Sequence, residues 1–351
     1  MAVFDPLAMT TLSSTSDSAR RATMNDVARL AGVSIKTVSR VVNDEPAVHP
    51  ETAARVLAAI EELGFRRNAG ARNLRRGSTT GTLGLIVEDV GNPFYSELTR
   101  AVERVATAFG RQVLTGSSEE NPDRERELAL EFCGRRVDGL LIVPAGDRHT
   151  YLGPELRSGT PVVFVDRPPG DLAADTVLVD NAAGAAQAAA HLAAHGHRRI
   201  AFVGDSPEIH TARERLRGFR EGCARAGIGP EERVVVMREP GEDSVAEPVH
   251  RMLAAPDPPT AVVAGNNRVT VELLRALGGR ERRPALVGFD DFELADLLDP
   301  PVSVVAHDVG LLGRTAAELL FARLQGDQSP PRKVVLPVRL IARGSGEVAP
   351  A

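Results

Sequence analysis

The stretch TMNDVARLAGVSIKTVSRVVN, residues 23–43, decides the fold of the N-terminal part of the chain. It predicts a helix that Thr23 caps, with Asp26 three residues later to complete a capping box. Gly32 ends that helix, because a left-handed backbone is needed there, and Ser34 caps a second helix at once. Two helices joined by so tight a turn are typical of a helix-turn-helix, whose second helix enters the major groove of DNA.

The predicted second helix separates an apolar face from a basic one. Val38, Val41 and Val42 recur at helical spacing and are expected to pack inward. Lys36 and Arg40 lie on the other face and carry donors that can read guanine edges. A solvated basic face on an ordinary helix would have the same composition. The tight turn before this helix and a third helix after it favour DNA recognition.

A third helix completes the predicted all-α head. It runs from Pro50, in its first turn, to Leu63, and Gly64 is its stop. His49 occupies the N-cap, a position that serine or threonine fills better because a hydroxyl oxygen accepts a backbone N–H. The apolar stripe of this helix consists of Val56, Leu57, Ile60 and Leu63.

Charge is unevenly distributed along the chain. Residues 20–77 contain 11 Lys and Arg against 6 Asp and Glu, whereas the whole chain has a formal net charge of −5. A basic head on an acidic body indicates a polyanion bound at one end. The 351 residues, 43% hydrophobic and 25% charged, indicate a globular protein of more than one domain. No apolar run approaches the roughly 20 residues that span a bilayer.

The head resembles a known family of DNA-binding proteins. The runs from Thr23 to Ala28, Ala31 to Ser34 and Thr37 to Asn43 closely resemble the head of the lactose-repressor (LacI/GalR) family, without a gap. The resemblance implies that Ile35, Lys36 and Arg40 read bases. It implies that another set contacts the phosphate backbone: Thr23, Ser34, Thr37, Ser39 and Asn43.

The segment from Asn68 to Arg76 links the head to the rest of the chain. Its composition is basic and weakly helical, and a flexible tether is one interpretation. In the family that it resembles, this hinge folds into a helix on operator DNA and wedges a leucine into the minor groove. Leu74 matches that leucine, with Ala71 beside it. Gly70 departs from the family's usual residue and costs about 1 kcal/mol of helix propensity.

Short apolar runs alternate with longer helical segments from Thr82 onward. This alternation predicts an α/β body with parallel sheets, and the strands are too many for one sheet, so two Rossmann-like lobes of periplasmic-binding-protein type are expected. Ligands in such folds bind outside the carboxyl ends of the strands. The predicted strands are Leu83–Val87, Gln112–Thr115, Gly139–Val143, Val162–Val165, Arg199–Val203, Arg233–Val236, Ala261–Ala264, Ala285–Gly288 and Val302–Val305.

The predicted domain organisation has four parts. Residues 1–22 form a disordered tail, 23–67 the helix-turn-helix head, 68–80 the hinge and 81–345 the two-lobed body. The first lobe is predicted to contain residues 81–178 and 308–327, and the second lobe residues 181–304 and 333–345.

Polar residues at the ends of the predicted strands match the family's effector pocket. The resemblance places six residues there, of which Arg213 and Asp290 carry most weight: Phe94, Tyr95, Asp166, Arg213, Asn266 and Asp290. His307 stands where the family usually has glutamine. Carboxylates, an amide and an arginine offer the partners that sugar hydroxyls need. A sugar is therefore expected, although Phe94 and Tyr95 leave a nucleoside or purine corepressor open.

Catalytic and metal-binding motifs are weak or absent in the sequence. It contains no GxSxG, P-loop or well-placed GxGxxG, so neither an enzyme nor a cofactor is expected. His191, His195 and His197 could share a metal, but Gly196 interrupts their helix and structural roles are favoured. Cys133 and Cys223 lack a CxxC partner and are expected to be buried in helices.

Other kinds of binding protein share parts of this pattern. An exported sugar-binding module has the same two-lobed body, but the lack of a signal peptide and the presence of the head favour a cytoplasmic, nucleoid-associated repressor. Control by a partner protein is a further alternative. Residues 343–351 contain no leucine heptads, so a homodimer is expected, and a two-fold dimer implies a pseudo-palindromic operator. The sequence leaves open whether the effector releases or promotes DNA binding.

Overall fold

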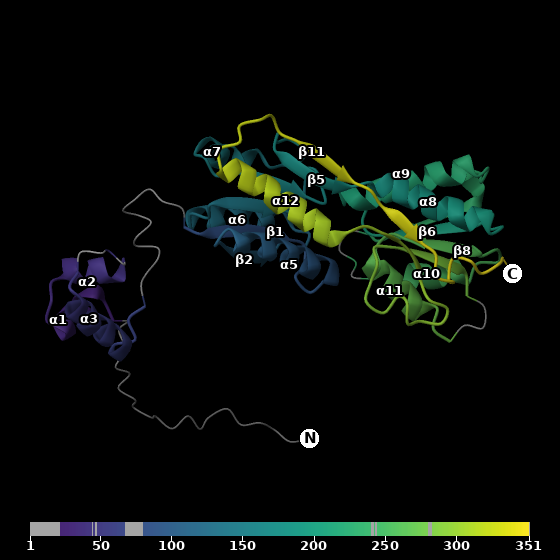
Figure 1. Ribbon diagram of the computed structural model, residues 1–351. Coiled ribbons are helices and arrows are strands. Elements are labelled where there is room, and N and C mark those ends of the chain that lie inside the picture. The colour runs from purple at the N-terminus through teal and green to yellow at the C-terminus, as the bar shows by residue number, and fades with distance from the viewer. Residues whose placement is uncertain are drawn as a thin grey trace, which may run out of the picture. The chain divides into compact units, whose positions relative to one another are not determined.

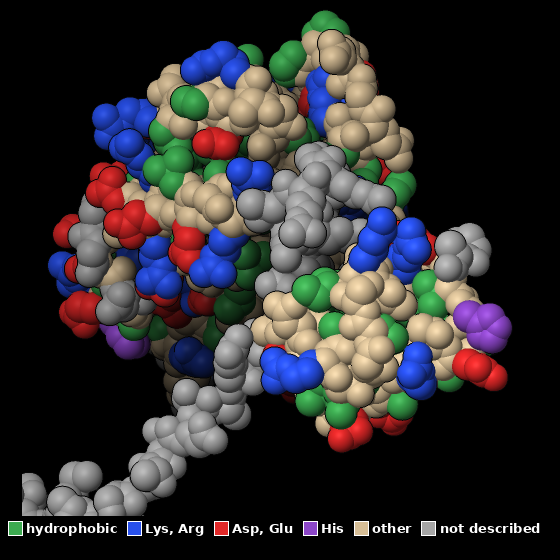
Figure 2. Space-filling view, turned by 90° about the vertical axis from the view of Figure 1, so that its left-hand side faces the viewer, with side chains coloured by type: hydrophobic (Ala, Val, Ile, Leu, Met, Phe, Trp, Pro, Cys, Tyr) green, Lys and Arg blue, Asp and Glu red, His purple; other side chains and the backbone are tan. Residues whose placement is uncertain are grey.

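The computed structural model describes residues 22–43, 45, 48–66, 80–239, 242, 244–279 and 283–350 (Figure 1). The chain divides between Ser78 and Thr79 into two units, a small helical head and a large body. None of the helices in the described ranges is long and apolar enough to cross a membrane. Over the face drawn in Figure 2, Lys and Arg side chains are interspersed with Asp and Glu.

The head consists of α1 (Met24–Ala31), α2 (Ile35–Val42) and α3 (Pro50–Glu62). The predicted capping box is confirmed, since the Thr23 N–H donates to Asp26 Oδ2 at 2.9 Å and the Asp26 N–H donates to Thr23 Oγ1 at 3.4 Å. Gly32 has a left-handed backbone with φ 64°, as the tight turn requires. The three helices share a small core, at whose centre lie the fully buried side chains of Val27, Val38 and Val56.

The N-cap of α3 is the weak point of the head. His49 holds the predicted N-cap position, and its side chain makes no capping hydrogen bond. Replacing His49 with serine is expected to stabilise the head by about 1 kcal/mol, because the new hydroxyl can accept an N–H of the first turn. Thermal unfolding should show the gain for His49→Ser and none for His49→Ala, which supplies no acceptor. Equal melting temperatures for the two variants would contradict the prediction.

The first lobe of the body is built on a parallel six-stranded sheet in the order β11-β5-β4-β3-β1-β2. Because parallel sheets are covered on both faces, these strands read as continuous apolar runs. The strands are β1 (Thr82–Val87), β2 (Gln112–Ser117), β3 (Gly139–Ile142), β4 (Val162–Val165), β5 (Asp175–Val179) and β11 (Lys333–Leu336).

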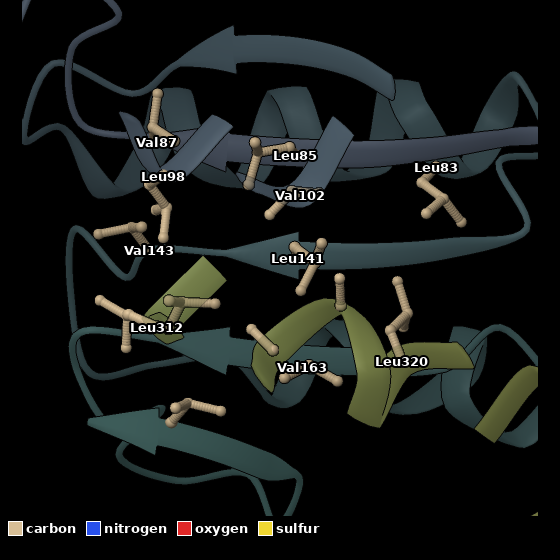
Figure 3. Packing of buried hydrophobic residues seen from close by; sticks show 14 of the residues in the cluster. Leu83, Leu85, Val87, Leu98, Val102, Leu141, Val143, Val163, Leu312 and Leu320 are labelled. Carbon is tan, nitrogen blue, oxygen red and sulfur yellow. The ribbon is translucent and has the colours of Figure 1, made fainter. Parts of the chain in front are cut away.

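Helices cover both faces of this sheet. Leu83, Leu85 and Val87 alternate along β1 and point to one face, where they meet Leu98 and Leu320 from two helices (Figure 3). Those two helices are α5 and α12, and α6 covers the other face. The helices of this lobe are α5 (Pro93–Ala108), α6 (Pro122–Gly134), α7 (Gly153–Arg157) and α12 (Val309–Leu324).

The second lobe repeats this plan around a sheet in the order β12-β10-β9-β8-β6-β7, in which β12 alone is antiparallel to its neighbour. Its strands are β6 (Ile200–Gly204), β7 (Arg233–Met237), β8 (Ala261–Ala264), β9 (Ala285–Phe289), β10 (Ser303–Ala306) and β12 (Arg339–Ile341). Its helices are α8 (Asn181–Ala194), α9 (His210–Arg225), α10 (Ala246–Leu253) and α11 (Asn267–Ala276). All nine predicted strands are present, within one or two residues at their ends.

One predicted lobe boundary is wrong. Residues 333–345 were expected in the second lobe, but Lys333–Leu336 pairs in parallel with β5 of the first. All five residues of β5 are buried, and β11 satisfies the backbone groups along its edge. The chain therefore crosses between the lobes after β5, after β10 and again between β11 and β12. Strands β5, β11 and β12 were missing from the prediction.

Candidate DNA-binding face and ligand cleft

The exposed face of α2 carries the predicted base-reading residues. Ile35, at the start of the helix, is 50% exposed, which is high for a large apolar side chain. Lys36 is exposed, and Arg40 is half-buried with its Nε 3.8 Å from Glu45 Oε2. An ion pair that long and exposed holds the guanidinium weakly. The face thus offers one apolar and two cationic side chains.

The predicted phosphate-contacting residues lie at the ends of the head's helices. Ser34 Oγ accepts from the Thr37 N–H at 3.2 Å and lies 2.9 Å from Thr37 Oγ1, at the positive end of α2. Asn43 Nδ2 donates to Ser39 Oγ at 3.3 Å at its other end. Thr23 caps α1. The hinge residues Ala71 and Leu74, with Gly70, lie outside the described residues.

The ligand cleft lies where the strand ends of the two lobes face each other. Its enclosed part is a cavity of about 40 Å³, and a wider cavity of about 1130 Å³ shares Glu88, Arg167 and Arg268 with it. Five of the predicted effector residues line the enclosed part: Phe94, Tyr95, Asp166, Asn266 and Asp290. His307 borders a neighbouring groove that also contains Phe94 and Asp290.

Asp166 and Asp290 occupy corresponding places in the two lobes. Each follows a central strand, and each has an unusual left-handed backbone, with φ 68° and 64°. The Asp166 N–H donates to Val177 O at 2.8 Å and the Asp290 N–H donates to Val305 O at 2.9 Å, both on the next strand. Both carboxylates are buried. Such backbone strain outside glycine is typical of functional sites.

The arginine that contacts Asp290 is Arg215. Its Nη1 donates to Asp290 Oδ2 at 2.9 Å and its Nε to Asn181 Oδ1 at 2.7 Å, and its guanidinium stacks 3.8 Å from the Phe289 ring centroid. Arg213, which was predicted to line the effector pocket, is exposed, and its Nη1 donates to the carbonyls of Pro207 and Glu208. Arg213 lies at the wider cavity and not at Asp290.

The position of Arg215 on α9 could have been found from the sequence. Thr211, Leu216 and Phe219 are buried on the same side of the helix as Arg215, at spacings of three and four residues. A charged residue on a buried stripe must be paired. Arg213 is off that stripe.

Arg167, which the prediction also missed, is buried beside Tyr95. Its Nη1 and Nη2 each donate to a Glu120 carboxylate oxygen at 2.6 Å, and Nη2 lies 3.4 Å from Tyr95 Oη. Phe94 packs edge-on against Tyr95, with ring centroids 4.8 Å apart. Asn266 caps α11 by accepting from the Val269 N–H at 2.8 Å. Phe94, Tyr95 and Asn266 thus line the cleft and each has a packing or hydrogen-bond contact there.

Several buried polar atoms around the cleft have no hydrogen-bond partner among the described residues. They include Asp166 Oδ1, Arg167 Nε, Arg238 Nε and both ring nitrogens of His307. The His307 side chain is 1% exposed, and its Nδ1 is 3.6 Å from Asp290 Oδ1. Burial raises the pKa of Asp166 and lowers that of His307. Unpaired buried polar atoms are costly, so these atoms mark places for a polar ligand.

Polar contacts across the cleft join the lobes. Asn267 Nδ2 donates to Asn92 Oδ1 at 2.9 Å. Arg268, beside it on α11, donates to Glu88 Oε1 at 3.0 Å and to Asp89 Oδ2 at 2.7 Å. These contacts lie at the rim of the cleft, where opening of the lobes would break them.

The three histidines near the end of α8 make contacts within the second lobe. The buried His197 has Nδ1 at 2.9 Å from Thr260 Oγ1 and Nε2 at 2.8 Å from Val348 O, and His191 contacts Glu347. No three His, Cys, Asp or Glu side chains in the described part of the chain are grouped to hold a metal. Cys133 and Cys223 are free thiols in helices, and burial raises the pKa of each to about 11.

A helix-turn-helix head joined to a two-lobed, cleft-bearing body defines a ligand-responsive DNA-binding regulator. Residues 23–68 match the model for bacterial regulatory proteins of the lacI family, and residues 189–346 match the periplasmic binding protein-like domain. The ribose operon repressor of Escherichia coli is 33% identical over 329 residues, which cover 92% of this chain and 99% of that protein. The chain belongs to the lacI family of transcriptional regulators, and the predicted fold class is confirmed.

Solved structures of relatives share both parts of the chain. The CelR–cellobiose complex is 32% identical, with a TM-score of 0.67, covering 93% of this chain and all of that one. The lac repressor dimer bound to operator and the anti-inducer ONPF is 26% identical, with a TM-score of 0.79, covering 94% of this chain and all of that one.

Proposed function

We propose that this protein is a cytoplasmic, nucleoid-associated repressor whose affinity for its operator changes when a sugar binds between the two lobes. The observation that carries the proposal is the cleft itself. Two buried aspartates with left-handed backbones, Asp166 from one lobe and Asp290 from the other, line its enclosed part together with Arg167 and Arg215. Carboxylates and arginines in this arrangement suit the paired hydrogen bonds of a polyhydroxylated ligand.

The DNA side of the proposal rests on the face of α2. Lys36 and Arg40 have the reach and the donors for base edges, and Ile35 can contact a thymine methyl group. Hydroxyl and amide groups at the helix ends hold phosphates. The hinge, through Ala71 and Leu74, would enter the minor groove. A homodimer presents two such heads, so its operator has two half-sites related by a pseudo-two-fold axis.

Ligand binding is transmitted through the body by a change in how the two lobes lie relative to each other. A sugar that satisfies Asp166 Oδ1 and His307 makes contacts to both lobes and so changes the balance between open and closed arrangements. The contacts of Arg268 with Glu88 and Asp89 join the two lobes at the rim of the same cleft. Since the chain continues from the first lobe into the hinge, a shift of the lobes alters the spacing of the two heads. Function is by binding, without catalysis.

The proposal is tested by selecting DNA from a random pool with the full-length protein. We expect an enriched pseudo-palindrome. Fluorescence anisotropy on that DNA then measures its affinity with ribose, galactose, glucose, cellobiose and their phosphates present, and at least one should change it by fivefold or more. The direction of that change tells an inducer from a corepressor. Enrichment without symmetry, or an affinity that no sugar changes, would contradict the proposal.

A further inference from the structure

Carboxylates outnumber cations in the enclosed part of the cleft. Its lining contains five carboxylates and three arginines. The carboxylates are Glu88, Glu120, Asp166, Asp205 and Asp290, and the arginines are Arg167, Arg215 and Arg268. The face of the protein in Figure 2, by comparison, shows both signs interspersed. The charge of the cleft therefore bears on which ligands can enter it.

Each of the three arginines already has a carboxylate partner. Arg167 binds Glu120 through two N–O contacts of 2.6 Å, and Arg215 binds Asp290 at 2.9 Å. Arg268 binds Glu88 at 3.0 Å as well as Asp89. A phosphate needs donors that are not already neutralised, because a guanidinium held by a carboxylate gives it little net attraction.

A fourth arginine, at the wider cavity, is engaged in the same way. Arg238 lies 3.3 Å from Asp205 and 2.6 Å from Glu272. Arg213, the fifth arginine at these cavities, is exposed and donates to the carbonyls of Pro207 and Glu208. An incoming ligand therefore meets its charge at the wider cavity and carboxylate oxygens in the enclosed part. Those oxygens accept hydrogen bonds from hydroxyl groups and repel anions.

Helix N-termini, the other common anion sites, are largely occupied by their own side chains. Asn92 caps α5 by accepting from the Phe94 N–H at 3.2 Å, and the first residue of that helix, Pro93, has no N–H. Asn266 caps α11. Helix α9 differs, since no side chain caps it, and its first amides can donate to a ligand oxygen at the cleft.

Protonation does not make the cleft positive. Burial, with the nearby Glu120, raises the pKa of Glu88 to about 7, and burial raises that of Asp166. With both of these protonated, three carboxylates would still balance the three arginines. The enclosed cleft thus ranges from negative to neutral, and a phosphate dianion would lose its hydration there without a compensating cation.

We infer that the effector is a sugar that carries neither a phosphate nor a carboxylate group. The inference rests on the proposed function, because it concerns the ligand of the same cleft. Hydroxyl groups can donate to the unpartnered Asp166 Oδ1 and can bond either ring nitrogen of His307. The ion pairs of the cleft then stay intact, and the ligand adds hydrogen bonds without adding charge.

Isothermal calorimetry with the full-length protein tests this by matched pairs. The probes are ribose with ribose 5-phosphate, glucose with glucose 6-phosphate, and fructose with fructose 1-phosphate. In any pair that binds, the free sugar should bind at least tenfold more tightly. A phosphate that binds as tightly as its free sugar overturns the inference but leaves a sugar-responsive repressor standing. Binding of neither member in any pair, with DNA affinity unchanged, overturns the proposed function and the inference with it.

Two adjacent glutamates provide a matched test of the cause. Glu120→Gln removes the charge that neutralises Arg167, whereas Glu119 is exposed at the wider cavity and pairs with Arg124 at 3.2 Å. Glu120→Gln should raise affinity for the phosphorylated member of a binding pair at least fivefold relative to the native protein. Glu119→Gln should leave it within twofold. Equal behaviour of the two variants would overturn the charge argument.

Discussion

Replacing Arg215 with methionine is expected to lower the free energy of unfolding of the body by about 3–5 kcal/mol. The side chain is buried, and its donors satisfy Asp290 Oδ2, Asn181 Oδ1 and the carbonyl of Gly265. Methionine fills much of the same volume but donates nothing, so Asp290 is left as a buried charge without its partner. Denaturant unfolding of the full-length protein, followed through the transition of the body, measures the loss.

Arg213→Met is the matched control, two residues away on the same helix. Its guanidinium is exposed and donates to two surface carbonyls, so the substitution should change stability by no more than about 0.5 kcal/mol. Arg215→Lys keeps the charge but loses the paired geometry, and should fall between the two. Comparable losses for the methionine variants at 213 and 215 would show that Asp290 does not depend on Arg215.

Local signals made most of the fold predictable. Caps, a turn glycine and helical periodicity lie within a few residues of one another, and they placed the helices of the head correctly. Central strands are continuous apolar runs because both faces are covered, so they too could be read directly. Of the three strands that escaped prediction, β11 and β12 are partly exposed edge strands, whereas β5 is a buried strand that pairs with the nearby β4 and was missed despite its apolar residues. Val335, in β11, is 50% exposed, and its strand is defined by pairing with a segment more than 150 residues earlier.

The ligand cleft was predictable in place but not in detail. Asp166 and Asp290 each follow a strand that the sequence predicts. In a doubly wound fold the carboxyl ends of the parallel strands lie at one edge of the sheet, where ligands bind. Ion-pair partners are set by three-dimensional packing, which sequence spacing does not report. Thus Glu120, far from Arg167 in the chain, appears as its partner only in the structure, whereas the buried stripe of α9 could have indicated Arg215 but not that it pairs with Asp290. The partners decide the charge that a ligand meets.

The head and the body use arginine in opposite ways. In the cleft, arginines are buried and neutralised by carboxylates, which favours an uncharged ligand. On α2, Arg40 is partly exposed and only weakly paired, which leaves its charge available to a polyanion. The same residue type therefore supports discrimination against phosphate at one site and attraction to it at the other.

Replacing both Lys36 and Arg40 with alanine is expected to weaken binding to the selected operator by at least about 30-fold. Each base-reading contact is worth about 1–3 kcal/mol, and separate positions add roughly. Neither side chain supports the core of the head, where Val38 of the same helix is fully buried, so thermal stability should be unchanged. Gel-shift titration at one fixed salt concentration measures the loss, and repeated selection from the random pool should show weaker base preference.

Arg29→Ala combined with Arg55→Ala removes the same charge from α1 and α3, outside the predicted recognition face. Arg29 is 79% exposed in its side chain and pairs with Asp26, and Arg55 is exposed. This control should weaken specific and non-specific binding alike, by about tenfold at most, with a shallower salt dependence. Loss of base preference only in the Lys36 and Arg40 variant would assign sequence reading to α2. An equal loss in both variants would mean that the net charge of the head, and not this face, sets its affinity for the operator.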